Sequence, residues 1–486
     1  MAVCAFAQTP AQDYHQILGP LFNAAPFVAK TSATKLGFDS VHQWNRIAID
    51  ASGLDHTPVA PGETRTFGEQ FGPTRASRAM AIVHIAIFDA LNAITGHYKS
   101  YTGLHPSIGP ASPDAVVAQA AHDTLVALFP SQTATFDEAL ALDLSKIKNS
   151  PAKIVGIDLG RRAATAILGM RIGDGSEVPE PIIGVNYFTS NLPGHWRQDP
   201  ISLIPIALGA HWGECAPFVL QSTSQFRVPP PPDLTSNEYA SAYGEAKAYG
   251  GDGVTTSTLR TPEQTFIGIF WAYDGTPSLC APPRLYNQIT VQIADQMHLG
   301  GVDLARLLAL ANTAMADAAM SIWESKYYYD FWRPITAIRE SDAGTGPTGA
   351  GDGNPVTIGD PTFTPLGAPA SNLVGPNFTP PFPSYPSGHG GFGGAVFQTL
   401  RRFFHTDAIA FTFVSDEFNG VTKDNAGNVR PYMPRTFSSL SQAEEENGQS
   451  RIYLGIHFRF DKTQAILQGR QVADYVFDHA FGPTRH

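Results

Sequence analysis

The sequence predicts an all-α fold built from two helical bundles with long irregular loops. Several stretches repeat apolar residues every three or four positions, as amphipathic helices do, and few stretches alternate as half-buried strands do. The 486 residues include 45 glycines and 39 prolines, which predict extensive ordered loops. Hydrophobic residues make up 43% and charged residues 15%, so the chain can bury a large core and lacks the composition of a disordered protein.

The first predicted bundle covers residues 1–172. One of its helices is expected to begin after Ser112, because a serine side chain caps helix N–H groups and Pro113 suits the first helical position. The stretch that follows is rich in alanine, which allows helices to pack closely in a bundle. We expect helices at residues 75–95, about 112–147 and 153–171.

Residues 173–265 differ from the segments on either side. They contain a run of four prolines and scattered aromatic residues, with little apolar periodicity, and we interpret them as an irregular connector. The second bundle is predicted to cover residues 266–486 and to contain the functional site. We expect its helices at residues 284–298, 302–328, 387–404 and within 438–480, with a Gly/Pro-rich loop at 340–385.

Charge and cysteine content exclude several classes of protein. The net charge of −11 argues against a nucleic-acid-binding protein, which needs a basic face. No uninterrupted apolar run reaches the roughly 18–20 residues of a membrane-spanning helix, so no membrane span is expected. Three cysteines are too few and too scattered for a disulfide framework or a zinc site. The low charge content is compatible with a homo-oligomer, and the oligomeric state stays open.

The first residues resemble part of a secretion signal. Ala5-Phe6-Ala7 has the form of a signal-peptidase site, but the basic region and the full apolar region that precede such a site are missing. An unstructured start explains the same residues equally well. On this partial signal we expect a secreted or periplasmic protein.

Two clusters of polar residues stand out in this charge-poor chain. Lys326 and Arg333 are seven positions apart, so they share one face if they lie on one helix. Ser387, Gly388 and His389 stand at a predicted helix start, where backbone N–H groups, a hydroxyl and an imidazole can meet one anion. Taken singly, the first cluster is explained as solvated charges and the second as a helix cap.

A third cluster follows near the end of the chain. Arg451 follows Ser450, and His457 and Asp461 are four positions apart, so the carboxylate can orient the imidazole if both lie on one helical face. Arginine gives paired donors to the oxygens of an anion, and lysine gives a compact charge. The three clusters together predict a site for a tetrahedral or trigonal-bipyramidal oxyanion, although a core histidine would explain His457 alone.

In order and spacing, the clusters resemble the signature of the superfamily that joins vanadium-dependent haloperoxidases and type-2 phosphatidic acid phosphatases. That signature is Lys-x6-Arg-Pro, then Pro-Ser-Gly-His, then Ser-Arg-x5-His-x3-Asp. Further stretches at 271–275, 282–287 and 393–398 resemble the vanadium chloroperoxidase branch, and the likeness is densest from about 265 to 461. The long gap between His389 and Ser450 implies an inserted loop relative to the compact phosphatases.

The resemblance implies roles for particular residues. His457 would be the one protein ligand of vanadium, with Asp461 orienting it. His389 would be the acid–base group when hydrogen peroxide binds, and Asp274 would pair with Arg451. Lys326 would also act on the reacting oxygen. The vanadate oxygens would be held by Lys326, Arg333, Ser387, Gly388 and Arg451.

The resemblance therefore implies a peroxidase that uses vanadate and no haem. It would oxidise bromide or iodide with hydrogen peroxide to hypohalous acid, which would halogenate a small organic acceptor. Trp323 and Phe382 match aromatic residues of the halide site in the chloride-oxidising branch. Two alternatives stay open, namely a phosphatase with His457 as nucleophile and a non-catalytic oxyanion-binding protein. Trp323, Phe382 and Asp274 favour the peroxidase over the phosphatase.

Overall fold

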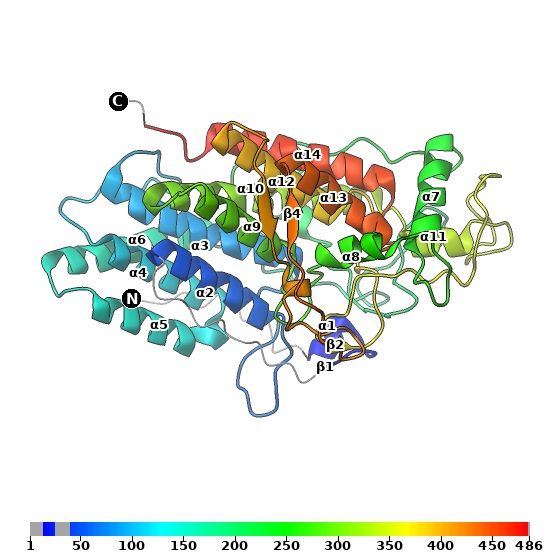
Figure 1. Ribbon diagram of the computed structural model, residues 1–486, viewed down its shortest axis with the longest axis horizontal. Coiled ribbons are helices and arrows are strands. Elements are labelled where there is room, and N and C mark those ends of the chain that lie inside the picture. Colours follow the sequence, from blue (N-terminus) through cyan, green and yellow to red (C-terminus); the bar gives the residue numbers. More distant parts are fainter. Residues whose placement is uncertain (1–12, 25–38, 485–486) are drawn as a thin grey trace.

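The computed structural model describes residues 13–24 and 39–484 of an elongated, predominantly helical protein (Figure 1). The predicted all-α fold class is confirmed. In the described part, strands are limited to two short antiparallel pairs, β1 (Asn23–Ala24) with β2 (Leu373–Val374) and β3 (Phe411–Phe413) with β4 (Arg435–Phe437). The signal-like residues Ala5 to Ala7 lie outside the described residues.

The helices gather into an N-terminal and a C-terminal group, which contain the predicted helices and others that were not predicted. The N-terminal group contains α2 (Ser40–Asp55), α3 (Gly72–Thr95), α4 (Pro113–Leu128), α5 (Thr133–Lys146) and α6 (Pro151–Met170). The C-terminal group contains α8 (Pro262–Phe270), α9 (Pro282–Gln296), α10 (Gly301–Tyr329), α11 (Pro334–Glu340), α12 (Gly388–Phe404), α13 (Leu440–Tyr453) and α14 (Arg459–His479). The remaining elements are α1 (Tyr14–Leu18), α7 (Asn237–Gly250) and the short helices η1 (Pro130–Gln132), η2 (Trp212–Glu214) and η3 (Asp416–Phe418).

The predicted helix at 112–147 is two helices. It starts as expected, because the Ser112 side chain accepts a hydrogen bond from the backbone N–H of Ala115 and Pro113 is the first helical residue. The expectation of one continuous helix was wrong at Phe129, where the backbone leaves the helical region before Pro130. Proline has no N–H to donate and restricts the residue before it, so the helix stops there.

The predicted irregular connector, residues 173–265, contains one substantial helix. Helix α7 begins after Ser236, whose side chain accepts a hydrogen bond from the N–H of Tyr239. The helix buries Tyr239 and Tyr243 against the C-terminal group. The prediction of an irregular segment was therefore wrong here, because the cap and the alanine content outweigh the proline run just before it.

Helix α10 connects the two groups of helices. It contacts α3 of the N-terminal group and α12 and α14 of the C-terminal group, and its residues are almost all buried. Figure 1 shows it running along the middle of the molecule. The domain boundaries at 172 and 265 stay a prediction, because this helix belongs to the packing of both halves.

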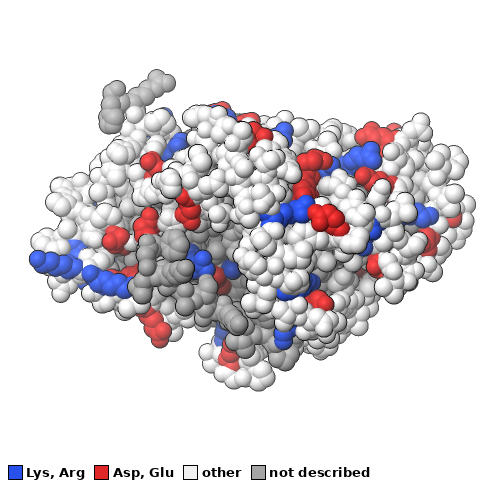
Figure 2. Space-filling view, viewed as in Figure 1, with Lys and Arg blue, Asp and Glu red and all other residues white. Residues whose placement is uncertain are grey.

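Helix α3 is long and apolar enough to cross a membrane by length and composition alone. Polar residues such as His84 and Asp89 interrupt it, so it is not the uninterrupted apolar run whose absence the sequence predicted. Of its most apolar window of 18 residues, 89% is buried inside the protein. The core helix of a globular protein meets the same criteria, so α3 is weak evidence for a membrane span. On the face shown in Figure 2, basic and acidic side chains are sparse and intermixed.

Helices α12 and α14 approach so closely that glycine is needed between them. A Cβ atom added at Gly469 would lie 2.1 Å from the backbone oxygen of Gly391 and 2.8 Å from the nitrogen of Ala395. Backbone atoms cannot move aside as the end of a side chain can. This contact fixes the start of α12, and with it Ser387 and His389, against α14.

We predict that Gly469→Ala lowers the free energy of unfolding by about 1–3 kcal/mol, the usual cost of overpacking a core. The matched control is Gly169→Ala in α6, where an added Cβ meets no atom within 4 Å. That change is expected to stabilise the protein by about 0.5–1 kcal/mol, because alanine costs less backbone entropy in a helix. Chemical denaturation measures both, and equal effects would contradict the packing argument.

Candidate active site

The three sequence clusters converge where α10 ends, α12 begins and the chain turns from α13 into α14. Lys326 lies in the last turn of α10, Ser387 is the N-cap of α12, and His457 stands just before α14. All three side chains are buried. Groups far apart in sequence therefore face one another inside the protein.

Lys326 reaches this place from α10. Its Nζ donates hydrogen bonds to the backbone oxygens of Pro383 at 2.8 Å and Ser384 at 3.0 Å. Burial and the neighbouring Arg333 guanidinium lower the pKa of the Lys326 ammonium well below its usual value, against the opposing effect of Asp461. A bound anion would raise this pKa again and favour the ammonium form.

Lys326 and Arg333 do not share a helix face, so that prediction was wrong. Helix α10 ends at Asp330, which adopts the left-handed conformation at φ 49°, and Arg333 is the N-cap of α11 before Pro334. A residue before proline avoids the helical conformation. The two cations nevertheless meet at the ring of Phe382, with Nζ 5.0 Å and the guanidinium carbon 4.9 Å from its centroid.

Three contacts fix the Arg333 guanidinium, and one of its nitrogens has no hydrogen-bond partner. Its Nε donates to the backbone oxygen of Phe382 at 2.9 Å, and its Nη1 donates to that of Ile456 at 2.8 Å. Nη1 also lies 3.0 Å from Nε2 of His457. Nη2 is buried without a hydrogen-bond partner. Burial lowers the pKa of Arg333 to about 9, so the guanidinium stays charged at neutral pH.

His457 and Asp461 pair through a helix cap rather than along a helix face. Helix α14 begins at Arg459, so His457 lies outside it, and the expected helical face was wrong. Asp461 Oδ2 accepts hydrogen bonds from Nδ1 of His457 at 2.8 Å, from the N–H of Phe458 at 3.0 Å and from the Ser384 hydroxyl. A carboxylate only accepts, so Nδ1 carries the hydrogen and Nε2 presents its lone pair.

The charge states of this pair suit a ligand imidazole. Burial raises the pKa of Asp461 to about 6, so the carboxylate is ionised at neutral pH. Burial, and then the nearby Arg333 and Lys326 charges, lower the pKa of His457 well below its usual value. His457 is therefore neutral over the physiological range, which is the form that binds a metal.

Arg451 and Asp274 form the pair that the sequence resemblance implied. Nη2 of Arg451 lies 2.7 and 2.9 Å from the two carboxylate oxygens of Asp274. Burial raises the pKa of Asp274, while the Arg451 charge opposes this shift. Nε and Nη1 of Arg451 are buried without partners. The Asp274 carboxylate thus accepts hydrogen bonds from Nη2 of Arg451, and the other two guanidinium nitrogens stay available for another acceptor.

The start of α12 contributes a hydroxyl and an imidazole. Ser387 caps the helix by accepting a hydrogen bond from the N–H of Gly390 at 3.3 Å. His389 is 5% exposed, and its Nε2 lies 2.5 Å from the backbone oxygen of Ala272. That oxygen only accepts, so Nε2 carries the hydrogen and Nδ1 is left as the basic atom. Burial and the Arg451 charge lower the pKa of His389 well below its usual value.

Trp323 and Phe382 form an aromatic corner beside the cations. Their ring centroids lie 4.9 Å apart in an edge-to-face arrangement, and Trp323 Nε1 donates to the backbone oxygen of Leu208 at 3.0 Å. Gly209 follows with φ 82°, and a Cβ there would lie 2.2 Å from the Trp323 ring. Residues 208 and 209 of the 173–265 segment therefore help to fix the position of Trp323. The sequence did not indicate this contact.

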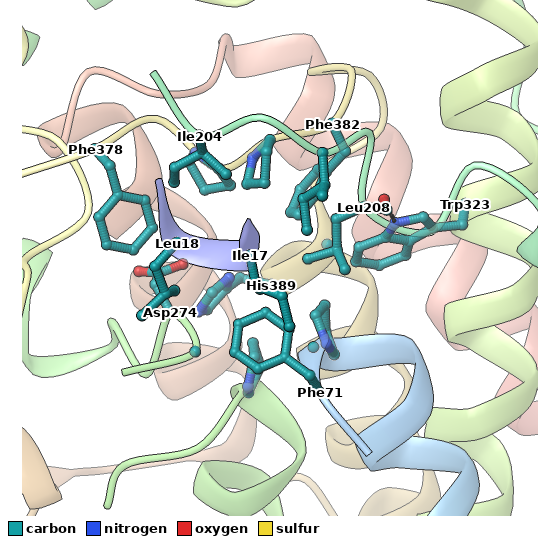
Figure 3. A pocket seen from close by; sticks show the side chains of 18 of the residues that line it. Ile17, Leu18, Phe71, Ile204, Leu208, Asp274, Trp323, Phe378, Phe382 and His389 are labelled. Atoms are coloured by element: carbon teal, nitrogen blue, oxygen red, sulfur yellow. Dashed lines mark hydrogen bonds between the residues drawn. The ribbon is translucent and has the colours of Figure 1, made fainter. Parts of the chain in front are cut away.

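One pocket of about 640 Å³, including its opening, is lined by part of this set, whereas Lys326, Arg333 and Ser387 are not among its lining residues (Figure 3). Asp274, His389, Arg451 and His457 line its polar part. The rest of its wall is apolar and comes partly from segments to which the sequence analysis gave no function. This apolar wall includes Ile17 and Leu18 of α1, Phe71, Ile204 and Leu208, together with Phe378 and Phe382.

The donor set suits an oxyanion better than a bare metal cation. Among the described residues, no group of three or more histidine, cysteine, aspartate or glutamate side chains is placed to hold a metal ion. By contrast, three guanidinium nitrogens of Arg333 and Arg451 are buried without partners. Three cations face two carboxylates, Asp274 and Asp461, so one positive charge is in excess. Buried donors of this kind need an acceptor, and an anion supplies it.

Known proteins share sequence with much of this chain. Residues 306–485 match the family model of the VCPO second helical-bundle domain. The chain is 32% identical to the vanadium chloroperoxidase of Curvularia inaequalis, over 87% of this chain and 79% of that protein.

Two solved structures share the fold. One is a bacterial vanadium-dependent iodoperoxidase, with a TM-score of 0.71 and 22% identity over 91% of this chain and 97% of that chain. The other is the apo form of a bacterial vanadium-dependent chloroperoxidase, with a TM-score of 0.61 and 18% identity over 85% of this chain and 96% of that chain. Extended similarity in sequence and fold leads to one conclusion: the chain belongs to the vanadium chloroperoxidase family of vanadium-dependent haloperoxidases.

Proposed function

We propose that this protein uses vanadate to oxidise bromide and iodide with hydrogen peroxide, and that its aromatic halide site also admits chloride. The reaction consumes one peroxide, one halide ion and one proton and gives hypohalous acid and water. The observation that carries this proposal is the set of three buried, unpartnered guanidinium nitrogens of Arg333 and Arg451, together with neutral His457, whose Nε2 lies 3.0 Å from Nη1 of Arg333. The family relationship supports the same activity.

The residues of the pocket fit vanadate. Nε2 of neutral His457 would be the ligand of the vanadium atom, and Asp461 would hold the ring in that tautomer. Arg333 Nη2 and Arg451 Nε and Nη1 would donate to vanadate oxygens, as would Lys326, the Ser387 hydroxyl and the amide of Gly388. The excess positive charge of the protein groups would be neutralised by the anion.

Bound vanadate supplies an electrophilic vanadium(V) centre that activates hydrogen peroxide towards a halide. The protein groups supply proton transfer and charge. Nδ1 of His389 takes a proton from the incoming peroxide, because Nε2 is already engaged with Ala272. Lys326 donates a hydrogen bond to the reacting oxygen and withdraws charge from it, which makes that oxygen easier for a halide to attack.

The halide would approach along the aromatic corner. Nζ of Lys326 lies over both rings, 5.6 Å from the centroid of Trp323 and 5.0 Å from that of Phe382, so a cation stands beside this corner. An apolar wall excludes water and strengthens these electrostatic contacts. The organic acceptor would meet hypohalous acid at or beyond the mouth of the pocket.

A vanadate titration of the vanadate-free protein in phosphate-free buffer tests this proposal. We expect halogenation of a cyclic dione to appear in proportion to bound vanadate, with iodide oxidised most readily, then bromide, then chloride. Phosphate should compete, because it has the same shape and charge as vanadate. Hydrolysis of a phosphate ester that vanadate inhibits, without halogenation, would instead establish a phosphatase.

We also propose that the protein is secreted or periplasmic. Hypohalous acid is a diffusible oxidant, which favours its production outside the cytoplasm. Cell fractionation with an antibody against the protein tests this, and activity confined to the cytoplasm would contradict it.

A further inference from the structure

The loop that carries Asp274 has an unusual backbone. Tyr273 has φ 48°, Gly275 has φ 83°, and Ser278 and Cys280 have φ 65° and 59°. Left-handed conformations are unfavourable for bulky side chains and persist only where the surroundings hold them. The position of Asp274, and through it that of Arg451, therefore depends on what packs against this loop.

The 405–439 segment, the long insertion between α12 and α13, packs against this loop. The backbone N–H of Tyr273 donates to Oε1 of Glu417 at 3.3 Å, and the backbone N–H of Asp416 donates to Oη of Tyr273 at 2.6 Å. Two consecutive residues of η3 thus hold Tyr273 at its backbone and at the end of its side chain. Tyr273 is fully buried, so water does not compete for these bonds.

Glu417 and Asp416 are themselves held in place. Ser371 Oγ donates to Oε2 of Glu417 at 2.6 Å, and Arg430 forms an ion pair with the same oxygen. Asp416 Oδ2 accepts from Nε of Arg284 at 2.9 Å. Glu417 is 0% exposed. A buried carboxylate with this many partners forms a rigid support rather than a solvated charge.

We propose that Glu417 is a positioning residue of the oxyanion site, which fixes Tyr273 in its left-handed conformation so that Asp274 holds Arg451. This rests on the proposed vanadate site. It gives the insertion between His389 and Ser450 a function, since η3 lies within it. Burial raises the pKa of the Glu417 carboxyl to about 7. The negative charge of Asp274 also raises this pKa, which agrees with the short distance between the two carboxyl groups.

The central test is Glu417→Gln, which preserves the size of the side chain. Arg430 and Ser371 both seek the remaining oxygen, so the amide nitrogen faces the N–H of Tyr273 and that hydrogen bond is lost. We expect the dissociation constant of vanadate, measured by calorimetry on the vanadate-free protein, to rise about tenfold, as for other groups that orient ligands. Tyr273→Phe removes the hydrogen bonds that Oη makes with the N–H of Asp416 and with Oε1 of Gln288 but leaves the bond to Glu417, so it should raise the dissociation constant by less.

A matched control separates positioning from stability. Asp174 is also a buried carboxylate between arginines, at 2.7 Å from Nε of Arg78 and 2.8 Å from Nε of Arg171. Asp174→Asn should lower the melting temperature but leave the vanadate dissociation constant of the folded protein unchanged. The calorimetric stoichiometry reports the folded fraction in each variant, so loss of folded protein is not mistaken for loss of affinity.

A double-mutant cycle tests whether Glu417 acts through Asp274. In an Asp274→Ala background, Glu417→Gln should change the vanadate dissociation constant less than about twofold, because the group it positions is gone. Equal effects of Glu417→Gln in both backgrounds, or unchanged affinity in the single variant, would overturn the inference alone. A parent protein that bound no vanadate would overturn the proposed function as well.

Discussion

Replacing His457 by alanine is expected to abolish vanadate-dependent halogenation and to weaken vanadate binding by more than about 100-fold. Loss of a group that only orients a ligand costs about 10–100-fold in metal affinity, so loss of the ligand itself costs more. Nε2 of His457 carries the lone pair of the neutral imidazole and lies 3.0 Å from Nη1 of Arg333. Without it, Arg333 and Arg451 still attract an anion but no atom bonds to vanadium. Calorimetry and a halogenation assay measure the two losses.

A graded series makes this prediction specific. Asp461→Asn keeps His457 but replaces the carboxylate that accepts from Nδ1, so we expect an intermediate loss of about 10–100-fold in vanadate affinity. The matched control is His122→Ala in α4. His122 also lies 2.7 and 2.8 Å from two aspartates, Asp123 and Asp137, but far from the C-terminal helices in sequence. Undiminished affinity in His457→Ala, or an equal loss in His122→Ala, would contradict the assignment.

The sequence predicted the helices because each has a local cause. Ser112 with Pro113 and Ser387 with Gly388 start helices by capping, and the apolar spacing marks the buried faces. Helix α7 shows the limit of this reasoning. Its cap at Ser236 was visible, but the prolines beside it and the weak periodicity suggested a loop, whereas the cap, the alanines and the packing of Tyr239 and Tyr243 together stabilise a helix.

The site was predicted as a set of residues, but with the wrong geometry. Lys326 and Arg333 were expected to share a face if one helix held both, and Pro334 argued against such a helix, because the residue before a proline avoids the helical conformation. His457 and Asp461 were expected along a helix, yet the carboxylate caps α14. In both cases the side chains still meet, because a turn at a helix end brings residues four to seven positions apart close together.

Other parts of the site could not be predicted, because they depend on contacts between distant segments. The apolar wall formed by Ile17 and Leu18 requires α1 to lie at the pocket that α12 also lines, and no local sequence pattern indicates this. Glu417 has no sequence signal either. Its partners Tyr273, Ser371 and Arg430 come from three separate loops, and only the folded chain assembles them.

His389→Ala is expected to lower kcat/KM for hydrogen peroxide by about 10²–10⁴-fold, the usual contribution of a general base. Vanadate affinity should change much less, because the free guanidinium donors and His457 are untouched. His389→Gln separates two roles of the side chain, since its amide N–H still donates to Ala272 but the amide has no basic nitrogen. A glutamine variant with full activity would contradict the base assignment.

The pH dependence of the same variants gives an independent test. The pKa of His389 lies well below its usual value because of burial and Arg451, so Nδ1 stays unprotonated as pH falls from 7.5 through 6.5. The parent should therefore keep its kcat/KM for peroxide in this range and lose it only at lower pH, when His389 takes a proton before peroxide arrives. Bound anion raises this pKa and moves the loss to higher pH without changing its direction. In His389→Ala the acidic limb should disappear, because the group that titrates is gone, and an unchanged limb would assign the proton transfer to another residue.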